Sequence, residues 1–97
     1  KFNLKIRLQK PEAPLTEDLL KAWPNPTSDF LNIHLNGGKE FERIVLYNLM
    51  GQEVYNSGSM KARNAQIGTG QLANGIYVLS VVTPEGRLNK KIEVIKE

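Results

Sequence analysis

The sequence predicts an all-β fold, an immunoglobulin-like antiparallel β-sandwich of about seven strands. Short segments in which apolar and polar residues alternate recur along the chain, and turn-forming residues separate them at short intervals. No long helical period interrupts this pattern, which is typical of a two-sheet sandwich. The chain has 97 residues, of which 40% are hydrophobic, and this suffices for one domain with one modest core.

The N-terminal part of the chain predicts a strand followed by a linker. The alternation over residues 1–9 predicts a strand, which belongs either to this domain or to a preceding one. Residues 10–22 are interpreted as a linker, because the two prolines within them disfavour regular strand pairing. Inside the linker, Thr16 is expected to cap a single helical turn. The domain itself is expected to span residues 23–97.

Six more strands are predicted after the linker. The segment 41–47 is apolar on both of its faces, so it is expected to be a central strand. In the next strand, Val54 is expected to point inward. A turn at residues 83–86 has Pro second and Gly fourth, and is expected to join the last two strands into a hairpin. The predicted strands span residues 31–35, 41–47, 53–56, 65–69, 76–83 and 88–95.

No catalytic, cofactor-binding or metal site is expected. The sequence has no cysteine and one histidine, His34. This histidine lies on the polar side of a predicted strand and is interpreted as an exposed strand residue. The carboxylates do not follow a calcium-loop spacing, and the glycines do not follow a phosphate-loop spacing. The chain is therefore not expected to be an enzyme.

The charge pattern permits an acidic partner without requiring one. The formal net charge is +3, which is mildly basic. Basic residues gather at the C-terminal end of the chain, but glutamates lie between them and no aromatic residue joins them. This arrangement is typical of a solvated edge strand rather than of a nucleic-acid interface. No apolar run approaches the length of a transmembrane helix.

The stretch Trp23-Pro24-Asn25-Pro26 is expected to be a rigid entry into the fold. Each proline fixes its own φ and favours an extended conformation in the residue before it. Trp23 is expected to fold back as an apolar cover over one end of the sandwich. Folding alone accounts for such a stretch.

Three stretches of the sequence carry a family resemblance: WPNPTSDFLNIHL, IVLYNLMGQEVY and LANGIYVLSVVTPEGRLNKKIEVIKE. Together they resemble the type A C-terminal sorting domain of the type IX (Por) secretion system, which is found in exported proteins of Bacteroidetes. In the family pattern, Trp23 stands where Tyr or Phe is more usual, and Asp29 stands where Gly is common. The candidates for family motif and recognition residues are Trp23, Pro24, Asn25, Pro26, Tyr47, Asn48, Gly51, Leu72, Gly75, Tyr77, Lys90 and Lys91.

The resemblance implies a signal rather than a catalyst, carried at the C-terminus of a larger cargo protein. Such cargo crosses the inner membrane by a separate N-terminal signal, and the outer-membrane secretion machinery then recognises the folded C-terminal domain. In many members a sortase-like protease removes the domain, and the cargo passes from the periplasm to the cell surface or the extracellular space. The linker at residues 10–22 is the expected place for this cut.

The recognition surface is expected to be formed by the turns and by the last hairpin, residues 83–97. Exposed edge backbone there is suited to pairing with a receptor strand, and Lys90 or Lys91 to attracting an acidic partner. The alternative function is that of a fibronectin-like or carbohydrate-binding accessory module of an extracellular enzyme. It requires planar aromatic side chains on one exposed face, whereas the pattern assigns several of the aromatic residues to the core.

Overall fold

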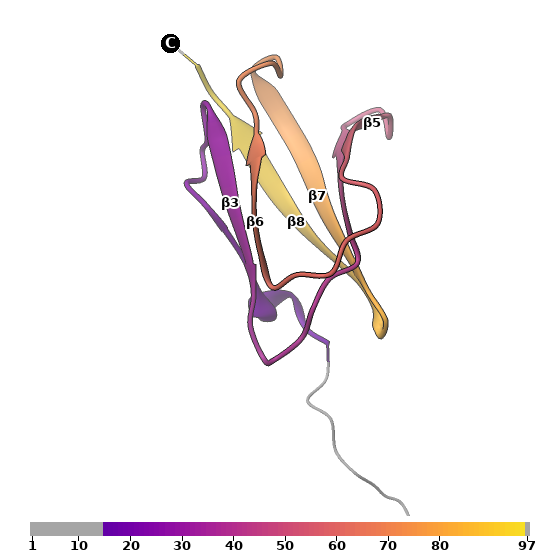
Figure 1. Cartoon of the computed structure of the whole chain (residues 1–97). Coiled ribbons are helices and arrows are strands. Elements are labelled where there is room, and N and C mark those ends of the chain that lie inside the picture. The colour runs from indigo at the N-terminus through magenta and orange to yellow at the C-terminus, as the bar shows by residue number, and fades with distance from the viewer. Residues whose placement is uncertain (1–14, 97) are drawn as a thin grey trace, which may run out of the picture.

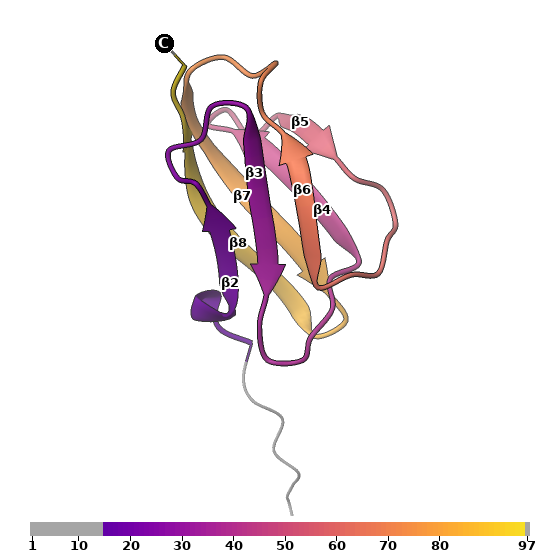
Figure 2. The ribbon, with the colours of Figure 1, turned by 60° about the vertical axis from the view of Figure 1, so that its left-hand side comes forward.

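Two antiparallel sheets, packed face to face, make up the residues that the computed structural model describes, 15–96 (Figure 1). The elements in chain order are the 3-10 turn η1 (Glu17–Leu19) and the strands β2 (Leu20–Trp23), β3 (Phe30–Leu35), β4 (Arg43–Asn48), β5 (Glu53–Asn56), β6 (Asn64–Gly68), β7 (Gly75–Thr83) and β8 (Gly86–Val94). One sheet has the order β2-β3-β6 and the other the order β5-β4-β7-β8, and Figure 2 shows the first in front of the second. The predicted all-β sandwich of about seven strands is confirmed. The strand predicted over residues 1–9 lies outside the described residues.

The core lies between the sheets and is built from every second residue of the long strands. Successive side chains of a strand point to opposite faces, so an alternating sequence places one apolar row inward. In β3 this row is Leu31, Ile33 and Leu35, each at most 1% exposed. The other strands contribute in the same way. The remaining core residues are Leu20, Phe41, Ile44, Leu46, Ile67, Tyr77, Leu79, Val81, Leu88, Ile92 and Val94.

β4 is an interior strand, as its two-sided apolar pattern predicts. It pairs with β5 on one side and with β7 on the other. Ile44 points into the core, whereas Val45 faces away from it and is still only 3% exposed. The outer face of this sheet is therefore partly apolar.

The expectation that Val54 points inward is wrong, since its side chain is 37% exposed. The pairing of β4 with β5 changes register between Leu46 and Tyr47. An irregularity of this kind shifts the alternation of inward and outward side chains by one position. Tyr55, which lies opposite Leu46, packs against the core instead.

Regular pairing begins earlier than the linker interpretation of residues 10–22 allows. Leu20 is fully buried and pairs with Leu35 as the first residue of β2. Both linker prolines lie upstream of this point, so they do not obstruct the pairing. Leu15 also packs against the core. The predicted linker thus ends in an ordered turn and strand that belong to the sandwich.

The helical turn expected after Thr16 exists as η1, but the side chain of Thr16 does not cap its backbone. The hydroxyl of Thr16 donates instead to the carboxylate of Asp18. This hydrogen bond lowers the pKa of Asp18 below its usual value.

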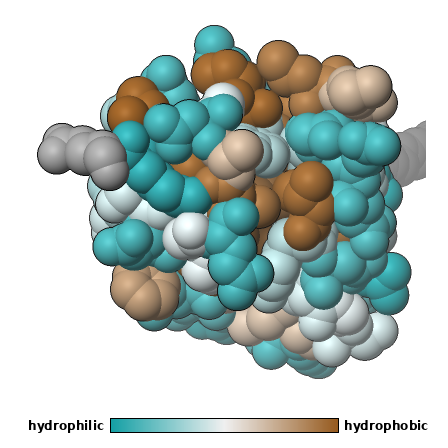
Figure 3. Space-filling view, turned by 90° about the horizontal axis from the view of Figure 1, so that it is seen from above, coloured by the Kyte–Doolittle hydropathy of each residue, from teal (hydrophilic) through white to brown (hydrophobic). Residues whose placement is uncertain are grey.

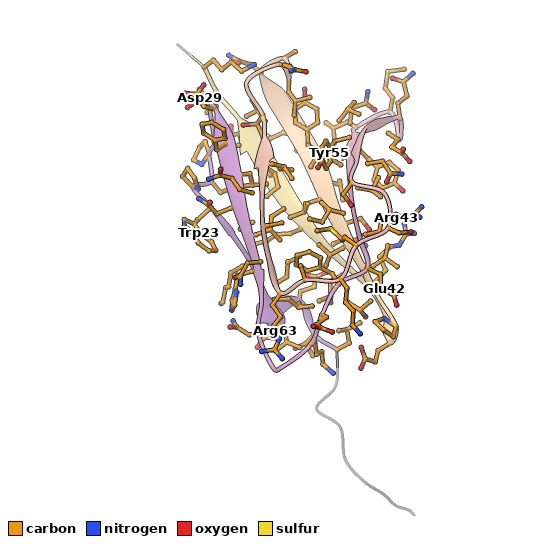
Figure 4. The ribbon with its side chains drawn as sticks, viewed as in Figure 1. Trp23, Asp29, Glu42, Arg43, Tyr55 and Arg63 are labelled. Atoms are coloured by element: carbon orange, nitrogen blue, oxygen red, sulfur yellow. The ribbon has the colours of Figure 1, made fainter. Side chains whose placement is uncertain are left out.

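Trp23 does not cover an end of the sandwich. It is 50% exposed and projects from the outer face of the three-stranded sheet (Figure 4). Phe30 shares this face and is 55% exposed. His34, also on this face, is half-buried, and its Nδ1 atom is hydrogen-bonded to Oδ1 of Asn64. The outer face of the three-stranded sheet is thus aromatic and amide-rich.

Candidate functional site

The three motif turns lie at one end of the sandwich, together with the last described residues of the chain (Figures 1 and 2). They are the loop from β2 to β3, the turn from β4 to β5 and the loop from β6 to β7. Figure 3 looks down on this end and shows apolar surface among polar side chains. In the β4–β5 turn, Leu49 and Met50 are 71% and 83% exposed.

Asn25, between the two prolines, attaches the first motif to the outer edge of β8. Its Oδ1 atom accepts a hydrogen bond from the backbone N–H of Glu93 at 3.0 Å. Its Nδ2 atom donates to the backbone carbonyl of Lys91 at 3.1 Å. The side-chain amide therefore replaces one peptide group of a neighbouring strand. The flanking Pro24 and Pro26 have no N–H to offer, so a side chain supplies the donor that this edge requires.

Thr27 continues the attachment through its backbone. Its N–H donates to the carbonyl of Glu93, and its own carbonyl accepts from the N–H of Ile95, both at 2.9 Å. Its hydroxyl is buried and bonds to the carbonyl of Phe30 and to the hydroxyl of Thr69, the latter at 3.2 Å. The chain thus crosses from the three-stranded sheet to the edge of the four-stranded sheet and returns.

The second motif locks the turn after β4. Oδ1 of Asn48 accepts from the backbone N–H groups of Met50 and Gln52, both at 2.9 Å. Gly51 has a φ of +82°, a left-handed conformation that side-chain-bearing residues adopt only at a cost. The hydroxyl of Tyr47, the residue before Asn48, faces Nη1 of Arg87 at 3.5 Å.

Gly51→Ala is expected to lower the free energy of unfolding by about 1–2 kcal/mol. The added Cβ meets no atom within 4 Å, so the whole effect comes from the backbone conformation. Urea unfolding of the purified domain measures it. Gly68→Ala is the matched control, because Gly68 has equal space and no positive φ. Equal stability of the two variants would contradict this account of Gly51.

The third motif secures the other side of the chain end. Tyr77 is 7% exposed, and its hydroxyl donates to the carbonyl of Ala73 at 2.7 Å. Leu72 packs against the core at the same loop. Asn74 exchanges two hydrogen bonds with the backbone of Lys96, at 3.0 and 3.2 Å. Gly75, with a φ of +157°, follows directly.

The two lysine candidates lie on opposite faces of β8. Lys90 is on the core side and half-buried, as expected for an edge strand. Lys91 is exposed on the outer face. The structure therefore does not bring them together as a single cationic site.

A family model described as a secretion system C-terminal sorting domain matches residues 21–96. The chain belongs to this family. The sorting domain is a C-terminal sorting signal for type IX secretion, which implies interaction with the secretion machinery and export across the outer membrane. The family is one of signals rather than of catalysts. Comparison with curated proteins found no match.

Within residues 15–96 of the sorting domain, no group of three or more acidic or histidine side chains is placed to hold a metal ion. In the same residues, no helix has the length and apolar character that a membrane crossing requires. Family membership favours the sorting signal over the accessory-module alternative.

Two residues of this site, Thr27 and Asn74, were not among the recognition candidates. Both precede or follow turn-forming residues, which is the only local signal that they carry. Their partners in β8 or just after it are 22 or more residues away. Local pattern does not reveal pairs of this kind.

Proposed function

We propose that the outer-membrane machinery recognises this sorting domain as a folded unit while the cargo is in the periplasm. The observation that supports this is the convergence of the first and third motifs on β8 and the residues directly after it. Asn25 and Thr27 bind its outer edge near Glu93, and Asn74 binds the backbone of Lys96. Residues so far apart in the sequence meet only when the domain is folded. The signal is then a surface rather than a linear peptide.

Any strand from a receptor that pairs with β8 has only the first half of its outer edge to use. Asn25 and Thr27 already occupy the edge from Lys91 to Ile95. By the alternation of the ladder, the outward backbone groups upstream of these are those of Arg87 and Asn89. Of the hairpin at residues 83–97 that was expected to be recognised, this leaves the part around Arg87 and Asn89 for strand pairing.

We further propose that a sortase-like protease releases the domain by a cut on the N-terminal side of Leu15. Proteases require a locally extended substrate, and cuts concentrate where the backbone opens at little cost. Opening residues 15–23 removes Leu20 from the core and breaks the pairing of β2 with β3. Sequencing the ends of the released fragments tests this. A cut within β2 would contradict it.

The function itself is tested by fusing residues 1–97 to a periplasmic reporter in a host that has the type IX machinery. We expect the reporter to appear at the cell surface or in the medium, and to remain inside an otherwise identical host without the machinery. The reporter alone is the second control. Retention of the fusion in the complete host would overturn the proposed function.

A further inference from the structure

The outer face of the four-stranded sheet carries a cationic and apolar surface, here termed the arginine face. In one row across the strands, Arg43 lies opposite Val82, which lies opposite Arg87. Two rows further along, Tyr47 lies opposite Val78. Strands that are apolar on both sides normally have both faces covered. The arginine face consists of Arg43, Val45, Tyr47, Val78, Ser80, Val82, Arg87, Asn89 and Lys91.

No further layer of residues 15–96 covers this face (Figures 1 and 2). Even so, Ser80 in its middle is fully buried, and its hydroxyl has no hydrogen-bond partner among the described residues. The register explains the burial. Arg87 contacts Tyr47 diagonally across β7, and Ser80 is the residue that lies midway along this diagonal. The Arg87 side chain therefore extends over a buried polar group.

The Arg87 side chain, which covers Ser80, is held in place only weakly. The separation between Nη1 of Arg87 and the hydroxyl oxygen of Tyr47 is 3.5 Å, which is long for a hydrogen bond. A carboxylate that bound the guanidinium in bidentate fashion would form a stronger, charge-assisted pair. Moving Arg87 would also expose the Ser80 hydroxyl to the incoming group.

Beside this cover lies a hollow of about 470 Å³, lined by both arginines. Within residues 15–96 the ion pairs are those of Lys39 with Glu85 and of Lys61 with Glu40, so neither arginine is paired. The carboxylate of Glu42 lines the same hollow, which leaves an excess of one positive charge. Figure 4 places Glu42 and Arg43 on the opposite side of the sandwich from Trp23. The hollow is completed by Ser59, Met60 and Val82.

We propose that the arginine face is the surface by which this domain docks onto an acidic protein surface of the outer-membrane secretion machinery, an inference that rests on the proposed function. The occupant is identified by charge: two unpaired guanidinium groups flank Val82, and a carboxylate beside an apolar side chain complements them. Arginine and tyrosine are also the residues that contribute most to binding at protein interfaces. Lys91, opposite Val78, shares its row with Glu53, opposite Tyr47, so the excess of positive charge lies at the two arginines.

The first test reverses the charge of both arginines, Arg43→Glu with Arg87→Glu, in the reporter fusion. The matched control, Lys21→Glu with Arg63→Glu, changes the net charge equally. Both control residues are exposed and lie outside the arginine face. We expect the arginine variant to reduce export by about tenfold or more, and the control to leave it unchanged. Urea unfolding of the purified variants separates a lost contact from a lost fold. If the reversal destabilises the domain, Arg43→Gln with Arg87→Gln replaces it and is expected to reduce export in the same direction.

The second test identifies the occupant by a photoreactive residue at Asn89, which is exposed next to Ser80 on the arginine face. A residue at Gln66, exposed on the outer face of the other sheet, is the control. We expect Asn89 to form an adduct with an outer-membrane protein in cells that contain the machinery, and Gln66 to form none. An adduct with a second copy of the domain or with a polysaccharide would overturn the proposal, as would export of the arginine variants at the unmodified level.

If the unmodified fusion is retained, the proposed function fails as well. If it is exported while the variants are unaffected, only the docking surface is wrong.

Discussion

Phe41→Ala is expected to lower the free energy of unfolding of the sorting domain by about 3–5 kcal/mol. Phe41 is fully buried and is among the largest of the fully buried side chains. Its removal leaves a cavity that the surrounding strands fill only partly. Domains of this size have a total stability of about 5–10 kcal/mol, so this one change removes much of it. Urea or thermal unfolding of the purified domain measures the loss.

Phe30→Ala is the matched control, because it removes the same side chain from a position that is 55% exposed. Its cost is expected to remain below about 1 kcal/mol. Neither phenylalanine is among the recognition candidates or belongs to the arginine face. If the machinery recognises the fold, Phe41→Ala is retained inside the cell at temperatures at which the domain unfolds, and Phe30→Ala is exported. Undiminished export of an unfolded Phe41→Ala fusion would show that the machinery reads a linear sequence.

The second large effect is expected from Asn25→Ala combined with Asn74→Ala. Together these changes remove the two amides that bind the backbone at Glu93 in β8 and at Lys96 just after it. Each amide forms two hydrogen bonds at a solvent-accessible site. Removing one amide is expected to destabilise the attachment of the chain end by about 1 kcal/mol. Amide hydrogen exchange resolved by residue measures it. The N–H groups of Glu93 and Lys96 are expected to exchange about tenfold faster.

Asn89→Ala serves as the control for this pair. Asn89 is exposed on the same strand, and its side chain forms no hydrogen bond within residues 15–96. The backbone of β8 is expected to exchange at its normal rate in this variant. Unchanged exchange at Glu93 and Lys96 in the double variant would show that the asparagines are not what secures the chain end.

Most strands were predictable because burial in a strand alternates with a period of two, which is a local property. In β3 and β7 the inward residues, among them Leu31 and Leu79, follow this period without interruption. Val54 was misplaced because the register shift lies in the pairing of two strands, not in either sequence. β2 was missed because its four residues become a strand through their pairing with β3.

For the site, the sequence indicates which residues belong to the motifs, but not what each of them binds. The motif asparagines are recognisable in the sequence, but Asn25 binds residues 66 and 68 positions away. The candidate list also grouped Lys90 with Lys91, which β8 places on opposite faces. Arg43 and Arg87 are not among the individual candidate residues, because only the register of β4, β7 and β8 places them in one row.

Local alternation and turn chemistry are therefore enough to specify an all-β domain and its principal strands, and the three motif stretches indicate its family. The attachment of the first motif to the last strand, the position of Trp23 on an open face and the row of arginines arise from packing between distant segments. Side-chain direction within a strand is set by neighbouring residues. The identity of the facing strand and its register depend on how the whole chain closes around its core.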